Sequence, residues 1–362
     1  MKTVALIMAG GTGARLYPRS TAKHPKQLIH LLGEGTMIQN TVMRLMPLFT
    51  PEDIYIVTSD DLAPLVKEQL PAIPAHNIIM EPFRRNTAPS LALSNIMLGK
   101  RYDPDTVVVS VPSDHIVHNV GEFHQSLEVA IETAHTLQGI VTIGIEPTRP
   151  ETGYGYVQIS DEPESLGALY QQNVRNVTVF AEKPDVATAQ RFIDAGDFLW
   201  NSGMFVYRLD TFDKEFQTHL PEHAPLFEPL KQETSLAAFN QLLHNAYRQI
   251  RPVSMDYGIM EKTNNVQCII SSFEWSDVGS WDELYRLSKK DSRKNVLEGD
   301  VFTVGTKGCF VSSYGKVIGL VGVEDLVVID SENVLLITKR GNTQTVSELV
   351  DLLRRKQIHK LI

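Results

Sequence analysis

A strand that leads straight into a glycine-rich loop constrains this chain most. Residues 4–8 form an apolar run, and Gly10, Gly11 and Gly13 follow it closely. Glycines after a strand let backbone N–H groups approach a phosphate without side chains in the way. Open α/β sheets bind their ligands at the carboxyl ends of their strands. The pattern therefore predicts a nucleotide site at the end of the first strand.

Two commoner glycine loops do not fit the sequence. A P-loop needs GxxxxGK followed by Ser or Thr, and the chain contains no such string. The dinucleotide fingerprint GxGxxG needs a third glycine where Leu16 stands. Two cations accompany the loop instead, Arg15 and Lys26, and they supply the positive charge that a triphosphate requires.

Composition excludes several classes of partner. The formal net charge of -9 argues against nucleic-acid wrapping and membrane adhesion, because both need a basic surface. Two cysteines, Cys268 and Cys309, are too few for a disulfide framework. The sequence has no apolar run near 18 residues, and its start lacks the pattern of a signal peptide. We expect a cytoplasmic protein without nucleic-acid or membrane partners.

The first half of the chain alternates predicted strands and helices. Several strands are continuous Val/Ile runs, which indicates burial on both faces and parallel pairing. We therefore predict an α/β fold with a doubly wound, mostly parallel, Rossmann-like sheet. The predicted strands are 4–8, 54–59, 77–82, 107–115 and 140–145, and the predicted helices are 61–69, 89–99 and 122–137.

The second half changes character twice. Residues 153–210 contain short strands and apparent hairpins, and residues 288–295 form a charge-rich linker. Beyond the linker, short β-rich segments precede an amphipathic helix predicted at 344–359. We predict two domains, 1–288 and 289–362, the second small and β-rich.

The combination GGTGxRLxP and PKQ resembles the sugar-nucleotidyltransferase family, and within it the mannose-1-phosphate guanylyltransferases. Further blocks follow in the order that family shows: EPFRRNTAP (81–89), VPSDH (111–115), TGYGYVQ (152–158), FAEKP (180–184), WNSGMFVY (200–207), MDYGIMEK (255–262) and WSDVGSW (275–281). The resemblance implies that the C-terminal domain is a short β-helix. The sequence lacks the isomerase extension of bifunctional relatives, so we expect transferase activity alone.

The reaction that the resemblance implies transfers GMP from GTP to α-D-mannose 1-phosphate and releases pyrophosphate. The nucleophile is an ionised phosphate oxygen, so catalysis reduces to positioning and charge neutralisation with Mg²⁺. Magnesium takes oxygen ligands such as carboxylates. The resemblance makes Asp114 and Asp277 the metal ligands, although an aspartate after a strand is also a common turn former or helix cap.

The resemblance also assigns binding residues. The expected catalytic residues are Arg15, Lys26, Asp114, Lys183 and Asp277. The expected nucleotide-binding residues are Ala9, Gly10, Gly11, Gly13, Arg15, Lys26, Glu81, Arg85, Asn86, Thr87, Pro112 and Asp114. The expected sugar-phosphate site consists of Gly153, Tyr154, Gly155, Glu182, Lys183, Asn201 and Asp277. An isolated EKP string is more often an exposed charged turn, and Trp200 and Phe205 are expected in the core.

The segment EPFRRNTAP resembles the one that lines the nucleoside pocket in guanylyltransferases, so the resemblance assigns base selection to it. Guanine presents N1–H and N2–H donors beside O6, so a selective pocket needs acceptors next to a donor. A second interpretation is a capped helix, with Asn86 or Thr87 as the cap and Pro89 in the first turn. Both interpretations can hold together.

Three alternatives stay open at this stage. The chain could use glucose 1-phosphate with dTTP or UTP, or it could be a catalytically silent regulatory paralogue. A metal-dependent glycosyltransferase is a third alternative, but those enzymes typically carry a DxD string, whereas the sequence PSDH offers one aspartate. We expect GTP, mannose 1-phosphate and a second copy of the chain as partners.

Overall fold

The computed structural model describes residues 1–11 and 13–358. By its internal contacts the chain forms two compact units. Unit 1 comprises Met1–Gly10, Val42–Ser113 and Val117–Trp275, and unit 2 comprises Gly11–Thr41, Asp114–Ile116 and Ser276–Ile362. We predicted two domains that are each continuous in sequence and meet between residues 288 and 289. The two units are defined by contacts and each contains several segments, so that domain boundary stays a prediction.

Unit 1 is built on a sheet of strand order β3-β2-β1-β4-β9-β6-β10-β8-β7 among the described residues. Neighbours β3, β2, β1 and β4 pair in parallel, as do β6 and β10. Strands β8 and β9 pair antiparallel with all their neighbours. Most described strands therefore run in one direction, which confirms the predicted sheet. The strands are β1 (Thr3–Met8), β2 (Ile54–Ser59), β3 (Ile78–Glu81), β4 (Val107–Pro112), β6 (Ile140–Ile145), β7 (Gly155–Ser160), β8 (Val174–Glu182), β9 (Phe198–Arg208) and β10 (Val266–Ser271).

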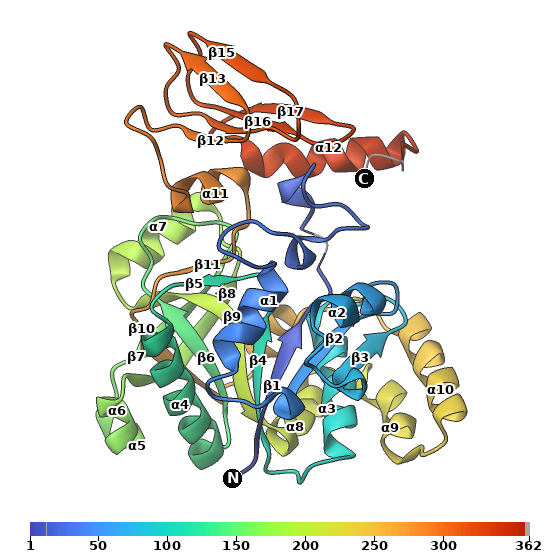
Figure 1. Ribbon diagram of the computed structural model, residues 1–362. Coiled ribbons are helices and arrows are strands. Elements are labelled where there is room, and N and C mark those ends of the chain that lie inside the picture. The colour runs from blue at the N-terminus through green and yellow to red at the C-terminus, as the bar shows by residue number, and fades with distance from the viewer. Residues whose placement is uncertain (12, 359–362) are drawn as a thin grey trace. The chain divides into compact units, whose positions relative to one another are not determined.

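Helices cover both faces of this sheet (Figure 1). Helix α3 packs against β1 and β3, and α4 packs against β6, β9 and β10. Within the described residues, no helix combines the length and the apolar character that crossing a lipid bilayer requires. The helices of unit 1 are α2 (Ala63–Gln69), α3 (Thr87–Gly99), α4 (Val120–Leu137), α5 (Pro163–Leu166), α6 (Ala168–Gln171), α7 (Val186–Ala195), α8 (Leu209–His219), α9 (Ala224–Gln232) and α10 (Leu236–Gln249), followed by a π-helical turn at Asp256–Met260.

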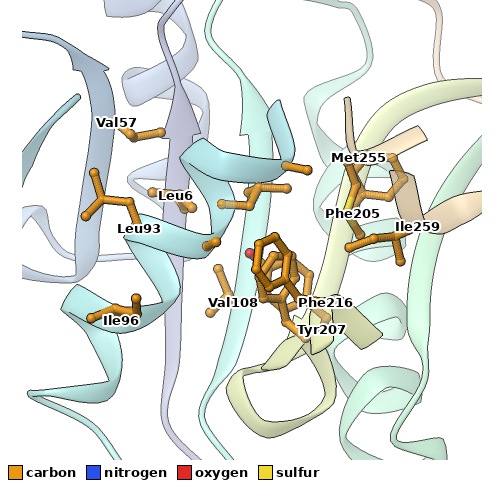
Figure 2. Packing of buried hydrophobic residues seen from close by; sticks show 14 of the residues in the cluster. Leu6, Val57, Leu93, Ile96, Val108, Phe205, Tyr207, Phe216, Met255 and Ile259 are labelled. Carbon is orange, nitrogen blue, oxygen red and sulfur yellow. The ribbon is translucent and has the colours of Figure 1, made fainter. Parts of the chain in front are cut away.

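The core of unit 1 lies between the central strands and the helices that cover them. Leu6 of β1 and Val108 of β4 pack with Leu93 and Ile96 of α3 in one apolar cluster (Figure 2). Every residue of β2 and β6 is buried, as expected for strands that are covered on both faces. Burial of apolar surface on both faces holds the strand ends, which carry the loops, in fixed positions.

Several predicted boundaries shift by a few residues. The strand predicted at 107–115 ends at Pro112, because its last residues turn away from the sheet. The helix predicted at 89–99 begins at Thr87. The helix predicted at 344–359 spans Val346–Arg355 as α12, after a short 3-10 turn, and residue 359 lies outside the described residues. The predicted core residues Trp200 and Phe205 are buried.

Unit 2 contains a short β-helix. Strands β12, β14 and β16 pair in parallel, as do β13 and β15, and β17 closes the sheet antiparallel to β16. This confirms the predicted β-rich C-terminal domain with its terminal helix. The elements are α11 (Trp281–Leu287), β12 (Val296–Glu298), β13 (Val301–Val304), β14 (Phe310–Ser312), β15 (Ile318–Val321), β16 (Leu326–Asp330), β17 (Leu335–Lys339) and α12, and the chain passes from one unit to the other in α1 (Met37–Leu45), β5 (Ile116–Val117) and β11 (Trp275–Ser276).

The core of unit 2 joins residues from both ends of the sequence. Leu16 and Tyr17, which follow the glycine loop, belong to one buried cluster with Trp281, Phe310 and Val346. The Trp281 indole Nε1–H donates to the Tyr17 carbonyl oxygen at 3.0 Å. In Figure 1 the blue segment after β1 accordingly lies against the red helix α12. The glycine loop is thus supported by residues more than 250 positions away in the sequence.

Candidate active site

The glycine loop makes a close turn over Lys26. Ala9 extends β1 by donating its N–H to the Val57 carbonyl oxygen at 2.8 Å, and Gly10 follows it. Gly13 has φ = +64°, and a Cβ there would collide with the Cβ of Lys26. Only glycine satisfies both conditions at once. The sequence therefore places a glycine where the backbone must pass directly over the lysine.

Lys26 connects the two segments that carry the predicted metal ligands. Its side chain is buried, and its ammonium lies 2.7 Å from Asp114 Oδ2. The same ammonium donates to the backbone carbonyl of Asp277. All three residues belong to unit 2. The structure thus brings Lys26 into contact with two aspartate segments that lie 88 and 251 residues from it in the sequence.

Asp114 is held in its ionised form. Burial acts to raise the pKa of this carboxyl, but the Lys26 ammonium and the neighbouring His115 outweigh burial and leave the pKa below its ordinary value. A permanently charged carboxylate is what a divalent cation needs as a ligand.

Asp277 sits on a tightly constrained loop. Its Oδ1 accepts the Gly279 N–H at 2.9 Å, and Val278 between them has φ = +46°, an unusual conformation for a β-branched residue. A Cβ on Gly279 would lie 2.8 Å from Asp277 Oδ2 and 3.2 Å from Arg15 Nη1. The Arg15 guanidinium and the Asp277 carboxylate therefore border the same small space. Gln344 Oε1 accepts a hydrogen bond from the same Arg15 Nη1 at 3.2 Å.

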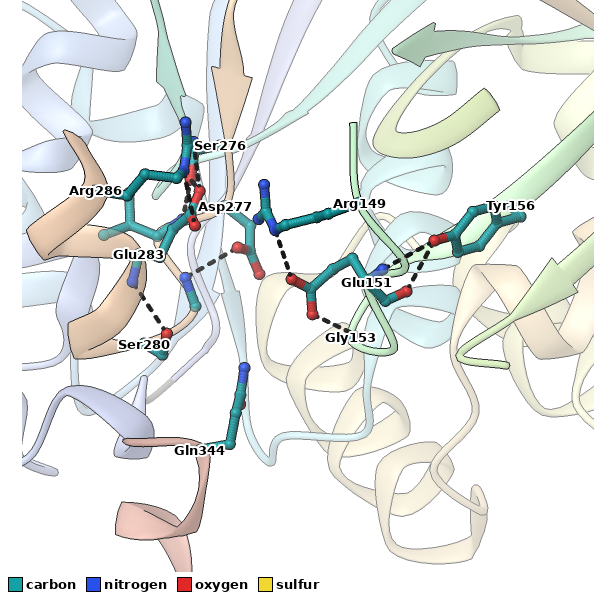
Figure 3. A network of polar contacts seen from close by, with 12 residues as sticks. Arg149, Glu151, Gly153, Tyr156, Ser276, Asp277, Ser280, Glu283, Arg286 and Gln344 are labelled. Atoms are coloured by element: carbon teal, nitrogen blue, oxygen red, sulfur yellow. Dashed lines mark hydrogen bonds and ion pairs between the residues drawn. The ribbon is translucent and has the colours of Figure 1, made fainter. Parts of the chain in front are cut away.

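A capping arrangement anchors the end of this loop (Figure 3). Ser280 caps α11 by accepting the Glu283 N–H at 3.2 Å, and Glu283 Oε1 accepts the Ser276 hydroxyl at 2.8 Å. Together these two bonds tie Ser276 and Ser280, the residues on either side of Asp277 and Val278, to Glu283. The strained backbone is thus held by the hydrogen bonds around it.

The residues present suit a magnesium ion. Among the described residues, no group of three or more His, Cys, Asp or Glu side chains could enclose a metal by itself. Magnesium is commonly held by one or two carboxylates, with substrate phosphates and water completing the shell. The side chains of Asp114 and Asp277, whose segments both contact Lys26, would fit that smaller ligand set.

Unit 1 gathers most of the predicted sugar-phosphate residues into a second cluster, whereas the predicted member Asp277 belongs to unit 2. Lys183 Nζ lies 2.5 Å from Glu182 Oε1, and Asn201 Nδ2 donates to Asp256 Oδ1 at 3.0 Å. A Cβ on Gly155 would collide with Glu182 Oε2, so the missing side chain leaves room for that carboxylate. The cluster joins the ends of β7, β8 and β9 to the turn that follows α10.

Asp256 is a member of this cluster that the sequence analysis missed. Burial and the nearby Glu182 raise the pKa of its carboxyl to about 6. Burial acts to lower the pKa of the Lys183 ammonium, but Glu182 and Asp256 outweigh burial and raise it. The block MDYGIMEK carries Asp256, but no residue of that block was assigned a role, because an isolated aspartate in it has no distinctive spacing.

The TGYGY loop is fixed by Glu151 (Figure 3). Glu151 accepts from Arg149 Nε at 3.3 Å and from the Gly153 N–H at 3.2 Å. The Tyr154 ring packs edge-on against Trp200, so only its backbone is available at this position: its carbonyl accepts the Lys183 N–H at 3.1 Å. The loop thereby positions the lysine backbone.

The predicted base-binding segment surrounds a buried carboxyl. Glu81, at the end of β3, is 3% exposed and accepts the Tyr247 hydroxyl at 2.8 Å. Burial raises the pKa of Glu81 to about 7, although hydrogen bonds from Ser90 and Tyr247 act in the opposite direction. A Cβ on Gly10 would lie 3.8 Å from Glu81 Oε2, so this carboxyl adjoins the start of the glycine loop. Tyr247 carries no signal in the sequence, because it is one aromatic residue on an amphipathic helix.

The capped-helix interpretation of EPFRRNTAP is confirmed. Asn86 Oδ1 accepts the Thr87 N–H at 2.9 Å at the start of α3, and Asn86 has the strained φ of +71°. Thr87 Oγ1 accepts the Met255 N–H, and Arg85 Nε donates to the Tyr247 carbonyl at 2.8 Å. Pro112 ends β4 opposite Met8 of β1.

Comparison with known proteins extends these observations. The family model described as nucleotidyl transferase matches residues 4–294, and one described as a MannoseP isomerase/GMP-like beta-helix domain matches residues 299–353. The first match covers most of the chain. The chain belongs to the nucleotidyl transferase family. Because the family is defined by transfer of a nucleotidyl group, membership favours this nucleotidyl transferase over the glycosyltransferase alternative.

Relatives of this nucleotidyl transferase match over nearly its whole length. Mannose-1-phosphate guanylyltransferase of Klebsiella pneumoniae is 35% identical over 359 residues, which are 97% of this chain and 74% of the relative. The enzyme of the same name from Salmonella muenchen is 36% identical over 98% of this chain and 74% of the relative. The crystal structure described as mannose-1-phosphate geranyltransferase from Thermus thermophilus superposes with a TM-score of 0.86, at 31% identity, over 98% of this chain and 100% of that one.

Proposed function

We propose that this nucleotidyl transferase transfers GMP from GTP to α-D-mannose 1-phosphate, giving GDP-mannose and pyrophosphate. The observation that carries the proposal is that Lys26 contacts both the Asp114 and the Asp277 segments. Relatives named mannose-1-phosphate guanylyltransferase, which match nearly all of this chain and 74% of their own length, support it. A cation that contacts the Asp114 carboxylate and the backbone of Asp277 is suited to a site for phosphates that carry several negative charges.

The unit 2 residues serve the triphosphate. Arg15 and Lys26 bind its phosphates and stabilise the pyrophosphate as it leaves. Asp114 and Asp277 hold Mg²⁺, which when bound supplies positive charge against the phosphate oxygens. The glycine loop at Gly11 and Gly13 offers backbone N–H groups in addition.

The unit 1 residues serve the sugar phosphate and the base. Lys183 orients the phosphate of mannose 1-phosphate, whose ionised oxygen attacks the α-phosphorus of GTP in line with the departing pyrophosphate. Glu182, Asn201 and Asp256 bind sugar hydroxyls. Glu81 accepts the guanine N1–H and N2–H groups. No protein base is required, because the nucleophile carries its charge already.

Pyrophosphate release tests the proposal directly. GTP, dTTP, UTP and ATP are each combined with mannose 1-phosphate and with glucose 1-phosphate in the presence of Mg²⁺. Fastest turnover with GTP and mannose 1-phosphate supports the proposal. A different best pair reassigns the substrates within the same family, and no turnover from folded protein favours the regulatory paralogue.

The ionisation of Glu81 predicts a pH dependence for GTP binding. Only the ionised carboxylate can accept both guanine donors, and its pKa is about 7. The KM for GTP should therefore fall about tenfold between pH 6 and pH 8, as the ionised fraction rises. Steady-state kinetics at saturating mannose 1-phosphate measures this fall.

The Glu81→Gln variant is the control for that pH dependence. Glutamine does not titrate, so its KM for GTP should be high at both pH values, and only the titration of GTP itself should remain. An equal fall in KM for the variant and the parent protein contradicts the role of Glu81.

The Lys26→Ala variant should weaken the use of GTP more than that of mannose 1-phosphate. Lys26 provides the charge beside Asp114, so its loss should raise the KM for GTP or slow pyrophosphate release by about 10- to 100-fold. Varying each substrate in turn separates the two effects. If only the KM for mannose 1-phosphate rises, Lys26 serves the sugar phosphate rather than GTP, and the proposed role is wrong.

We also propose that the protein works as a homodimer in the cytoplasm, without nucleic-acid or membrane partners. Supporting the dimer, Phe302 and Val304 of β13 and Val321 of β15 are about two-thirds or more exposed. Light scattering after size-exclusion chromatography should give twice the chain mass, and Phe302→Asp should lower it to the mass of one chain. A single-chain mass for the parent protein contradicts the dimer.

A further inference from the structure

Unit 2 contains a pocket of about 550 Å³ with an unusual share of basic side chains. It lies where the end of α11 meets the end of β17, and the proposed reaction uses none of its residues. Its basic members are Arg286, Lys290, Lys339 and Arg340, and the rest of its lining is Asp282, Tyr285, Asp325 and Gly341.

An aromatic ring holds two of these cations together. The Arg340 guanidinium lies 4.1 Å from the centroid of the Tyr285 ring, and the Lys290 ammonium lies 4.8 Å from the same centroid. The Tyr285 hydroxyl is fixed by donating to the Lys294 carbonyl at 2.6 Å. A ring face attracts one cation, but it does not neutralise the repulsion between two. This arrangement therefore leaves positive potential in the pocket.

The carboxylates nearby pair with the two arginines but not with the two lysines. Glu283 pairs with Arg286 at 2.7 Å (Figure 3), and Asp325 pairs with Arg340 at 2.5 Å. Asp282 is occupied by neutral donors, including the Gly341 N–H at 2.8 Å.

Lys290 is a cation without a carboxylate partner in the described part of the chain. Among the described residues it forms no ion pair, and its ammonium donates only to the backbone carbonyls of Arg286 at 3.0 Å and Ser288 at 2.9 Å. Burial, followed by the positive charges of Arg286 and Arg340, lowers its pKa. In addition, the buried Nε of Arg340 has no hydrogen-bond acceptor within the described part of the chain. The pocket thus holds donors and charge that an anion could satisfy.

We infer that this pocket binds a small anion through a phosphoryl group, at a site separate from the proposed active site. Arginine and lysine together suit phosphate oxygens, since the guanidinium provides directed donors and the ammonium a concentrated charge. Lys339 lies at the rim, where it can contact the remainder of a larger phosphate ester. The inference does not depend on which sugar or base the enzyme uses.

Isothermal titration calorimetry of the full chain tests this site. The titrants are pyrophosphate, inorganic phosphate and glycerol 3-phosphate in metal-free buffer, so that free phosphate and a phosphate ester are distinguished. Lys290→Gln should remove one binding event per chain, or weaken it at least about tenfold, relative to the parent protein. Lys289→Gln is the matched control, because Lys289 is exposed, carries the same charge and lies outside the pocket.

Each outcome decides the question. Loss of a binding event in Lys290→Gln but not in Lys289→Gln supports the site. Unchanged stoichiometry and affinity in Lys290→Gln overturn it, and so does an equal loss in both variants, which indicates diffuse surface attraction. Lys339→Gln should weaken the ester more than inorganic phosphate. Failure of the pyrophosphate-release assay would bear on the proposed function alone, since this titration requires no turnover.

Discussion

The Asp114→Asn variant is expected to lose at least about a thousandfold in turnover, equivalent to about 4 kcal/mol of transition-state stabilisation. The substitution removes one of two carboxylates proposed to hold Mg²⁺, and it changes the side-chain shape very little. The loss should persist at high Mg²⁺, because an amide oxygen cannot replace a carboxylate as a charge-neutralising ligand. Pyrophosphate release across a Mg²⁺ titration measures it, with Asp161→Asn as the exposed control.

A structural role for Asp114 has to be separated from this catalytic one. The substitution also leaves the buried Lys26 ammonium without its carboxylate, which should cost about 2 kcal/mol of folding stability. The double variant Asp114→Asn/Lys26→Gln removes both charges and should recover most of that stability by thermal unfolding. Because Lys26 itself belongs to the proposed site, turnover is compared in the single variant at a temperature where it stays folded, and parent-like turnover there would show that Asp114 only supports the fold.

The Lys183→Gln variant is expected to raise the KM for mannose 1-phosphate about 10- to 100-fold, with the KM for GTP changed less than about threefold. The physical reason is the loss of a charge-assisted bond to the sugar phosphate. The charge of Lys183 also balances Glu182 and Asp256, so its removal should raise the pKa of Asp256 above about 6. Steady-state kinetics with each substrate varied in turn checks the split.

Two comparisons sharpen that result. Lys183→Arg keeps the charge and should restore part of the affinity for mannose 1-phosphate. Lys67→Gln makes the same substitution on an exposed lysine and should change nothing. An equal rise in the KM for GTP and for mannose 1-phosphate would contradict the proposal that Lys183 binds the sugar phosphate.

The spacing of apolar residues along the sequence predicted the strands and helices of unit 1 well. The Val/Ile runs at 54–59 and 140–145 are buried throughout, and a strand covered on both faces has few alternatives to a central position. The hairpins expected in residues 153–210 agree with the antiparallel pair β7–β8, but the placement of β9 between β4 and β6 could not be predicted in the same way. Strand direction depends on how distant segments pair, and the spacing of apolar residues does not record it.

The candidate site shows the same limit. The glycine loop and Lys26 are close in sequence, and their chemistry is visible there. Asp256 acquires its raised pKa only from burial beside Glu182, which lies 74 positions earlier in the chain. Tyr247 contacts Glu81 across 166 positions. Neighbours of this kind arise from the tertiary fold, so they could not be identified from local residue types alone.

The mixed origin of unit 2 has a consequence for how such genes can recombine. Tyr17 rests on Trp281, and Arg15 is held by Gln344, so the segment after β1 depends on partners near the opposite terminus. A crossover between relatives that exchanges only residues from 276 onward would join the glycine loop of one protein to contact residues from another. The coding segments for residues 11–41 and 276–358 therefore have to be inherited as a matched pair, despite their separation.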